Sequence, residues 1–306
     1  MVSNYWNFTA APFDAALEPA TFYTGAPQEE ALARLEWIVD ERQRFALVVG
    51  VEGCGKSHLA SMATRRLGGL GAESVMLSLR GLTPGDWLEM LVGRLPLDAM
   101  SRGEPLRPWQ QLENRLRENT LMERTTAMVF DDIDDAPSDA LDGIVRLISA
   151  AEPRYARTVV VATATLSGLS RLPAVIRQRA AVRIELGPWD AADVAGFLSR
   201  ATQRVGGKAD IFSSDAAATL ARFSGGVPRV VSQLAHLSLV AAAGDALPQV
   251  DPGTVERTWR ELSPSGGADA SDAAVRSSPG LMAMDPDERD ELPVNPHVRV
   301  VRRLWG

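Results

Sequence analysis

The sequence has very little cysteine and histidine, and it has no long apolar run. Its single cysteine, Cys54, excludes an internal disulfide framework and a metal site built from cysteines. The three histidines, His58, His236 and His297, show no metal-ligand spacing. No apolar run reaches membrane-spanning length, and the N-terminus lacks a basic region followed by an apolar core. We therefore expect a soluble, cytoplasmic protein with no membrane span.

Composition narrows the class of protein further. The chain has 306 residues, of which 45% are hydrophobic and 23% are charged, as in a globular protein with one large and one smaller domain. The net charge of −7 argues against a general nucleic-acid-binding protein but leaves room for a local basic patch. Nucleic acid is therefore a disfavoured partner.

A phosphate-binding loop organises the chain. An apolar run over Phe45–Val49 predicts a buried strand, and it leads into the sequence GVEGCGKS, which fits the pattern G-x-x-x-x-G-K-[ST] between a strand and a helix. Its glycines let backbone N–H groups turn toward phosphate oxygens, and the helix that follows directs its positive end at the same anion. The predicted nucleotide-binding residues are Gly50, Gly53, Cys54, Gly55, Lys56, Ser57 and His58.

Lysine is so scarce that its position is informative. Lys56 and Lys208 are the only two lysines, and Lys56 stands where an ammonium group fits the phosphates of ATP. The Ser57 hydroxyl is placed to bind Mg²⁺. Cys54 is interpreted as a small residue that fits the loop, with redox sensing as a minor alternative. Packing against its own helix is favoured over catalysis for His58.

Acidic residues follow another apolar strand, predicted over Thr126–Phe130. We expect this strand to lie next to the first one and to place Asp131 on the magnesium and Asp132 on the attacking water. Asp134 and Asp135 are interpreted as solvated helix-cap charges that could substitute for them.

Three further groups of residues are candidates for the site. Thr163 is predicted to end the fourth strand, between the phosphate loop and the acidic strand, where it either contacts the water or γ-phosphate or has no role. Arg177 and Arg179, in a helix predicted within residues 173–183, are equally well explained as surface residues or as an arginine finger entering a neighbour's site. Pro228 suits a first helical turn and places Arg229 where it can reach the γ-phosphate.

Strands alternate with helices up to about Gly187, which predicts an α/β fold with a parallel, doubly wound sheet. The other strands are predicted over Ser74–Leu79, Thr158–Thr163 and Val182–Leu186. From Asp190 the pattern is helical only. We divide the chain into a nucleotide-binding domain with an aromatic N-terminal segment (1–187), a helical lid (188–262), and a disordered linker with a C-terminal peptide (263–306).

Taken together, these motifs resemble the AAA+ ATPases, and within them the general secretion pathway protein A (ExeA-like) family. The motifs that carry the resemblance are YWNF, PF, FY, EEALARL, GVEGCGKS, VFDD, VATATL, IRQR and SGGVPR, and they extend over Tyr5–Leu262. The resemblance implies a five-stranded P-loop domain with a helical lid, ATP and magnesium, and nucleotide-driven homo-oligomers. It assigns Lys56, Ser57, Asp131, Asp132, Thr163 and Arg229 to the roles given above.

The chain departs from that family in three respects. Asp132 stands where the family usually has Glu, and Thr163 stands where it usually has Gln. The membrane helix and peptidoglycan-binding domain of the secretion proteins are missing from this sequence, so a secretin-related role cannot simply be transferred. Similar stand-alone ATPases select transposition targets or load helicases, and those proteins bind DNA.

The C-terminal peptide Val294–Gly306 interleaves arginines with apolar residues and a tryptophan. We expect it to dock on a partner such as an inner-membrane or secretion component, on an acidic membrane surface or on the protein's own body, rather than to be a tail without function. Three functional hypotheses remain open. The first is an ATPase that couples turnover to assembly or remodelling of a partner complex, the second a switch in which Asp132 supports binding but not fast hydrolysis, and the third a DNA-associated adaptor.

Overall fold

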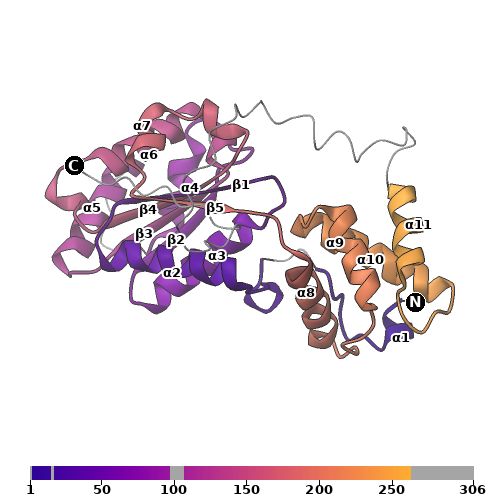
Figure 1. Ribbon diagram of the computed structural model, residues 1–306. Coiled ribbons are helices and arrows are strands. Elements are labelled where there is room, and N and C mark those ends of the chain that lie inside the picture. Colours follow the sequence, from indigo (N-terminus) through magenta and orange to yellow (C-terminus); the bar gives the residue numbers. More distant parts are fainter. Residues whose placement is uncertain (1, 15–16, 97–106, 263–306) are drawn as a thin grey trace, which may run out of the picture.

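The computed structural model describes residues 2–14, 17–96 and 107–262. Its centre is a sheet of five parallel strands in the order β2-β3-β4-β1-β5 (Figure 1). The predicted parallel α/β fold is therefore confirmed. The strands are β1 Phe45–Gly50, β2 Glu73–Ser78, β3 Thr126–Asp131, β4 Thr158–Thr165 and β5 Val182–Leu186.

The position of β4 corrects one prediction. The acidic strand β3 pairs with β2 and β4, so it is not the neighbour of β1. Instead, β4 lies between β1 and β3, and the expectation that its end separates the phosphate loop from the acidic run is confirmed. The strand also runs two residues further than predicted, because Val49 and Gly50 of β1 still pair with Ala164 and Thr165.

Helices cover both faces of the sheet, because the strands carry apolar side chains on both faces. In β1, Phe45, Leu47 and Val49 belong to the core on one face, whereas Ala46 and Val48 belong to the core on the other. One face is covered by α2 (Ala26–Asp40) and α3 (Lys56–Gly69). The opposite face is covered by α4 (Asp86–Arg94), α5 (Pro108–Leu121), α6 (Ser138–Ser149) and α7 (Ala174–Arg179).

Local contacts shape two of these helices. Helix α5 continues to Leu121, and near its end the polar Asn119 is buried through hydrogen bonds to Glu73 and Thr126. Ser138 begins α6, and Pro137 occupies the cap position. Short 3₁₀ turns complete the connections, namely η1 Pro19–Thr21, η3 Ile133–Asp135, η4 Pro153–Tyr155 and η5 Gly168–Arg171.

After β5 the chain forms a separate helical unit, which we call the lid. Its helices are α8 Ala191–Arg204, α9 Ser214–Ser224, α10 Pro228–Gly244 and α11 Pro252–Leu262. Asp190 and Ser213 cap the first two through hydrogen bonds from the backbone N–H groups of Asp193 and Ala216. The lid has its own apolar core, so it is held together independently of the sheet.

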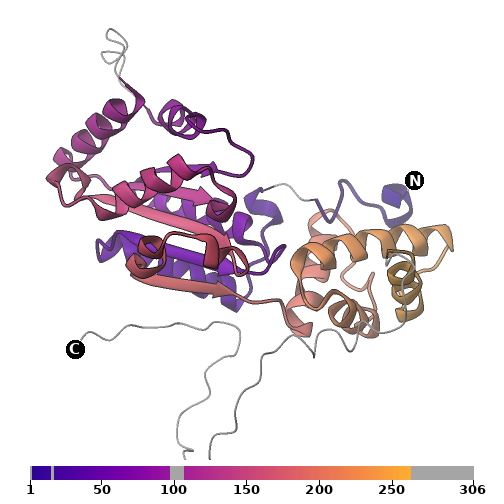
Figure 2. The ribbon, with the colours of Figure 1, turned by 90° about the horizontal axis from the view of Figure 1, so that it is seen from above.

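The N-terminal segment packs differently from the prediction that placed it with the sheet domain. Helix α1 (Val2–Trp6) lies against α10 of the lid (Figure 2), and Trp6 and Phe8 are buried in the lid core. The indole N–H of Trp6 donates to the Leu239 carbonyl at 3.2 Å. Phe22, in contrast, is buried in the core between α2, α3 and the sheet. The segment therefore contacts both units, and even Tyr23, the neighbour of Phe22, packs against Trp189 and Phe197 on the lid side.

Some predictions fall outside the described residues. These are part of the loop predicted over 96–108 and the whole C-terminal region 263–306, including the basic and aromatic peptide. Among the described helices, none combines the length and the apolar character that crossing a membrane requires.

Candidate nucleotide site

The phosphate loop leaves β1 at Gly50 and enters α3 at Lys56. Gly53 and Gly55 adopt positive φ angles of 79° and 95°, which glycine reaches without the strain that a side chain would cause. At Gly50 a Cβ atom would lie 2.5 Å from the Cys54 sulfur and 2.7 Å from the Leu186 carbonyl oxygen. The three predicted glycines are thus each required by the loop's conformation or packing.

Lys56 is the first residue of α3 and only 6% exposed. Its ammonium group donates to the carbonyl oxygens of Gly50 at 3.1 Å and Val51 at 2.9 Å. Among the described residues it forms no ion pair with a carboxylate, so its charge is available to an anion. The positive end of α3 adds to the attraction for phosphate at this point.

Asp131 and Asp132 are joined to β4 by a single buried hydroxyl. Thr163 is fully buried; its hydroxyl donates to the Asp131 carboxylate and accepts from the Asp132 backbone N–H at 3.0 Å. Asp131 is 3% exposed, whereas the Asp132 side chain is 14% exposed and lines a cavity. Thr163 thus holds the Asp131 carboxylate and the Asp132 backbone. It is not a strand-end residue open to the cavity, as the sequence-based prediction had placed it.

Thr165 is the actual end of β4, and it lines the same cavity. Its hydroxyl and backbone N–H both donate to Asp134, whose side chain is only 2% exposed. Asp134 is therefore a buried anchor for the turn after β4, and the interpretation as a solvated cap charge is wrong. A Cβ on Gly168 would collide with the Asp134 side chain, which explains how the aspartate can be enclosed there.

Arg80 is a site residue that the sequence reasoning missed. It follows β2, and its Nε lies 3.4 Å from Asp132 Oδ2 and 3.0 Å from Asp135 Oδ2. Burial and the charge of Asp131 raise the pKa of Asp132, while Arg80 and Lys56 oppose that rise. The available signal was that Arg80 is the first cation after a strand that ends at the same edge of the sheet as the acidic strand.

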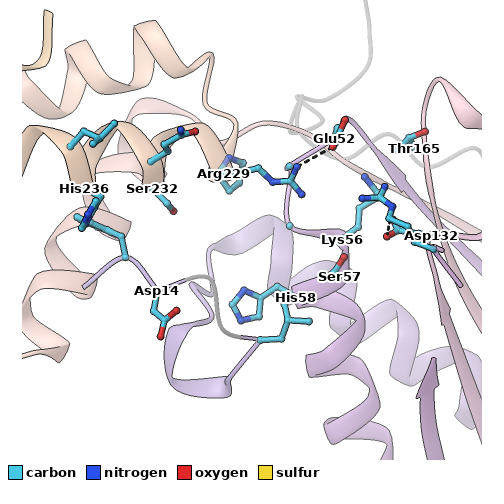
Figure 3. A pocket seen from close by; sticks show the side chains of 18 residues that line it. Asp14, Glu52, Lys56, Ser57, His58, Asp132, Thr165, Arg229, Ser232 and His236 are labelled. Carbon is cyan, nitrogen blue, oxygen red and sulfur yellow. Dashed lines mark hydrogen bonds and ion pairs between the residues drawn. The ribbon is translucent and has the colours of Figure 1, made fainter. Parts of the chain in front are cut away.

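The lid reaches the phosphate loop through Arg229, at the start of α10. Its backbone N–H donates to the Gly53 carbonyl at 3.1 Å, and its guanidinium donates to Glu52 at 3.0 Å (Figure 3). Both side chains of this ion pair are mostly exposed, at 63% and 68%. Gly53 has room for no side chain here, since a Cβ would lie 2.9 Å from Arg229 Cβ. The predicted proximity of Arg229 to the loop is thus observed.

One cavity of about 680 Å³ between the sheet domain and the lid is lined by Lys56, Arg80, Asp132, Thr165 and Arg229, whereas Asp131 and Thr163 do not line it. Figure 3 shows Lys56 and Asp132 on one side, with Ser232 and His236 of α10 on the other. Phe13 and Asp14 of the N-terminal segment also line it. A cavity of this size suits a nucleotide, since it has cations near the phosphate loop and apolar residues from the N-terminal segment and the lid.

Cys54 is a packing residue, as predicted, whereas His58 contacts the N-terminal segment and not only its own helix, which corrects the prediction for it. Cys54 is 3% exposed, and burial raises the pKa of its thiol, which disfavours the reactive thiolate. His58 Nε2 lies 3.2 Å from both the Thr21 hydroxyl and the Glu18 carbonyl oxygen, and burial lowers its pKa. Through these contacts His58 connects the N-terminal segment to the helix of the phosphate loop, and it also lines the cavity.

Arg177 and Arg179 are exposed in the short helix α7 and do not line the cavity formed by their own chain. Neither forms an ion pair with another described residue. Both interpretations, surface arginines and an arginine finger for a neighbour's site, therefore stay open.

Ser57 and Asp131 carry the oxygen donors expected for Mg²⁺. A hydroxyl and carboxylates suit this hard cation, and Ser57 lines the cavity beside Lys56. In residues 2–14, 17–96 and 107–262, no group of three or more His, Cys, Asp or Glu side chains is arranged to hold a metal. Mg²⁺ held by Ser57 and Asp131 would take its remaining ligands from phosphate and water.

Comparison with known proteins agrees with this geometry. The family model described as "AAA domain" matches residues 39–169. The chain is 23% identical over 269 residues to General secretion pathway protein A of Aeromonas hydrophila, which covers 86% of this chain and 49% of that protein. The chain thus spans about half the length of this relative.

Solved structures share the fold at low sequence identity. The Aeropyrum pernix ORC2 protein, solved as ADPNP–ADP complexes, has a TM-score of 0.61 and 14% identity, covering 83% of this chain and 72% of its own. Drosophila ORC bound to DNA has a TM-score of 0.64 and 18% identity, covering 91% and 69%. The Thermotoga maritima RuvB Holliday junction branch migration motor has a TM-score of 0.57 and 17% identity, covering 82% and 73%.

Proposed function

Because the chain is an AAA+ P-loop protein similar to General secretion pathway protein A, we propose that it binds ATP with magnesium and hydrolyses it to ADP and phosphate. The observation that carries this proposal is the convergence of Lys56, Asp132 and Arg229 on one cavity. Lys56 comes from the helix after the phosphate loop, Asp132 follows the acidic strand, and Arg229 belongs to the lid. Phosphate binding, water orientation and lid position can therefore be linked at one place.

Each residue has a distinct role in this proposal. Lys56 and the N–H groups of the loop bind the phosphates, and Ser57 and Asp131 would hold the magnesium ion. Mg²⁺ bound there supplies neutralisation of phosphate charge. Asp132, the more exposed of the two aspartates, orients the attacking water, while Thr163 fixes both aspartates. Arg229 exchanges Glu52 for phosphate and so couples the lid to nucleotide state.

A second candidate is a nucleotide-dependent switch with slow or no hydrolysis. The ion pair between Arg80 and Asp132 favours it, since it engages one oxygen, Oδ2, of the carboxylate that would orient water. In this case ATP binding alone would position the lid against the phosphate loop.

The process served is proposed to be assembly or remodelling of a partner complex. The relative's name supports a secretion-related complex as one candidate. We propose that ATP promotes homo-oligomers in which Arg177 or Arg179 enters a neighbour's site, since both are exposed. The C-terminal peptide at 294–306 is proposed to bind the partner.

Steady-state ATP turnover with magnesium, combined with light scattering, tests this function. The Lys56→Ala variant should lose turnover and ATP-dependent mass increase, whereas Lys208→Ala, which removes the other lysine, should keep both. Tight ATP binding without turnover would favour the switch and make Asp132→Glu the next variant. Absence of ATP binding by the unmodified chain would overturn the proposal.

A further inference from the structure

Arg80 stands at the carboxyl edge of the sheet, beside the acidic strand. The Leu79 backbone N–H donates to the Asp131 carbonyl at 2.9 Å, so the pairing of β2 with β3 continues to the residue before Arg80. Arg80 therefore leaves the sheet next to Asp132. It lines the same cavity as Lys56, and its side chain remains 46% exposed.

Only part of the Arg80 guanidinium is engaged. Its Nε donates to Asp135 at 3.0 Å and lies 3.4 Å from Asp132. Within the described part of the chain, the two terminal NH₂ groups donate no hydrogen bond. An arginine has five N–H donors in a planar fork, and this fork matches the oxygens of phosphate. Arg80 can therefore keep its contact with Asp132 and still bind a second anion.

Lys56, Arg80 and Arg229 line the same cavity, and their positive charges attract an anion there against the repulsion of the nearby carboxylates. Asp132, Asp135 and Glu52 each raise the pKa of Arg80, with Asp132 the largest of these causes. Glu52 is also the carboxylate that pairs with Arg229. Arg80 and Arg229 thus approach the phosphate loop from the sheet and from the lid, and both interact with carboxylates where an anionic ligand would bind.

We propose that Arg80 binds the terminal phosphate of ATP through its terminal NH₂ groups while its Nε continues to hold Asp132. This inference rests on the proposed nucleotide-binding function and adds to it a discrimination between ATP and ADP within one subunit. The terminal phosphate is the relevant group because the residue that orients the attacking water must face it, and Arg80 contacts that residue. Loss of this phosphate on hydrolysis then removes one ligand of Arg80.

Equilibrium binding separates this role from a purely structural one. The dissociation constants of ADPNP, a slowly hydrolysed ATP analogue, and of ADP would be measured calorimetrically with magnesium. For Arg80→Ala we expect ADPNP binding to weaken about 10- to 100-fold, as for a lost charge-assisted hydrogen bond, with ADP binding changed less than about 2-fold. Arg80→Lys should recover part of the loss, because it restores the charge without the fork.

Arg171→Ala is the matched control. Arg171 is an exposed arginine that lies 3.6 Å from the same Asp135 and 3.8 Å from Asp134, and it does not line the cavity. The Arg171→Ala variant should bind both nucleotides as the unmodified chain does. Circular dichroism melting would verify that each variant is folded. Equal weakening of ADPNP and ADP in Arg80→Ala, or no change in either, would overturn the proposal. Failure of the unmodified chain to bind either nucleotide would instead overturn the proposed function itself.

Discussion

The two sides of the cavity are built differently. On the sheet side, Lys56 and the Asp131–Thr163 pair that supports the acidic turn are at most 6% exposed and are held by hydrogen bonds to buried groups. Where the lid meets the loop, Arg229 of the lid and Glu52 of the phosphate loop form an ion pair that is mostly exposed to solvent. Removing the partner of a buried polar group lowers the free energy of unfolding considerably, whereas an exposed ion pair contributes little to it. The phosphate end is therefore formed before a ligand arrives, and the lid contact is readily exchanged.

The largest expected loss of stability comes from the sheet side. Thr163→Val keeps the shape of the side chain but leaves the Asp132 backbone N–H and the Asp131 carboxylate without their shared partner. We expect the free energy of unfolding to fall by about 1–3 kcal/mol in urea titrations. Thr158→Val, at the buried start of the same strand, controls for the loss of a hydroxyl. Equal effects of the two variants would contradict the special role of Thr163.

An intermediate loss is expected where loop and lid meet. Gly53→Ala places a side chain at a positive φ of 79° and against Arg229 and Val227. The backbone conformation alone should cost about 1–2 kcal/mol in thermal or urea unfolding. Gly71→Ala has a φ of 92° with nothing within 4 Å of its Cβ, so it measures that backbone cost without the lid contact. If Gly53→Ala is no more destabilising than Gly71→Ala, then the lid accommodates the added side chain without loss of stability.

The smallest effect on stability should come from Arg229→Ala. Its ion pair with Glu52 is exposed, so we expect less than about 1 kcal/mol of change in the free energy of unfolding. The same variant should still weaken ATP binding, because Arg229 is proposed to exchange Glu52 for phosphate. A loss of stability as large as that of Thr163→Val would show that the lid side is as firmly built as the sheet side.

The sequence was sufficient for the parts of the site that depend on neighbouring residues. The phosphate loop, its flanking strand and helix, and the parallel sheet follow from short-range patterns such as Gly50 to Ser57. The errors arose where distant pairing decides the outcome. Thr163 was taken as a strand end because the two further pairs with β1 cannot be read from β4 alone. Asp134 is enclosed only because Gly168, far along the chain, has no side chain.

Long-range contacts also explain what was not foreseen in the rest of the molecule. Arg80 lacks a motif of its own and becomes a site residue only because β2 lies beside β3. Trp6 and Phe8 were assigned with their segment to the nucleotide-binding domain, since nothing in their local sequence indicates that they pack against α10. Apolar residues in a short segment indicate burial without indicating the partner.

The N-terminal segment has a mechanical consequence for the lid. The chain crosses between the two units twice, once after β5 and once between Phe8, which is anchored in the lid core, and Phe22, which is anchored in the sheet domain. The two connections are also in contact with each other, since the ring centroids of Tyr23 and Trp189 lie 5.3 Å apart. The lid is thus tied to the sheet domain by two chain segments that meet, and not by one independent linker.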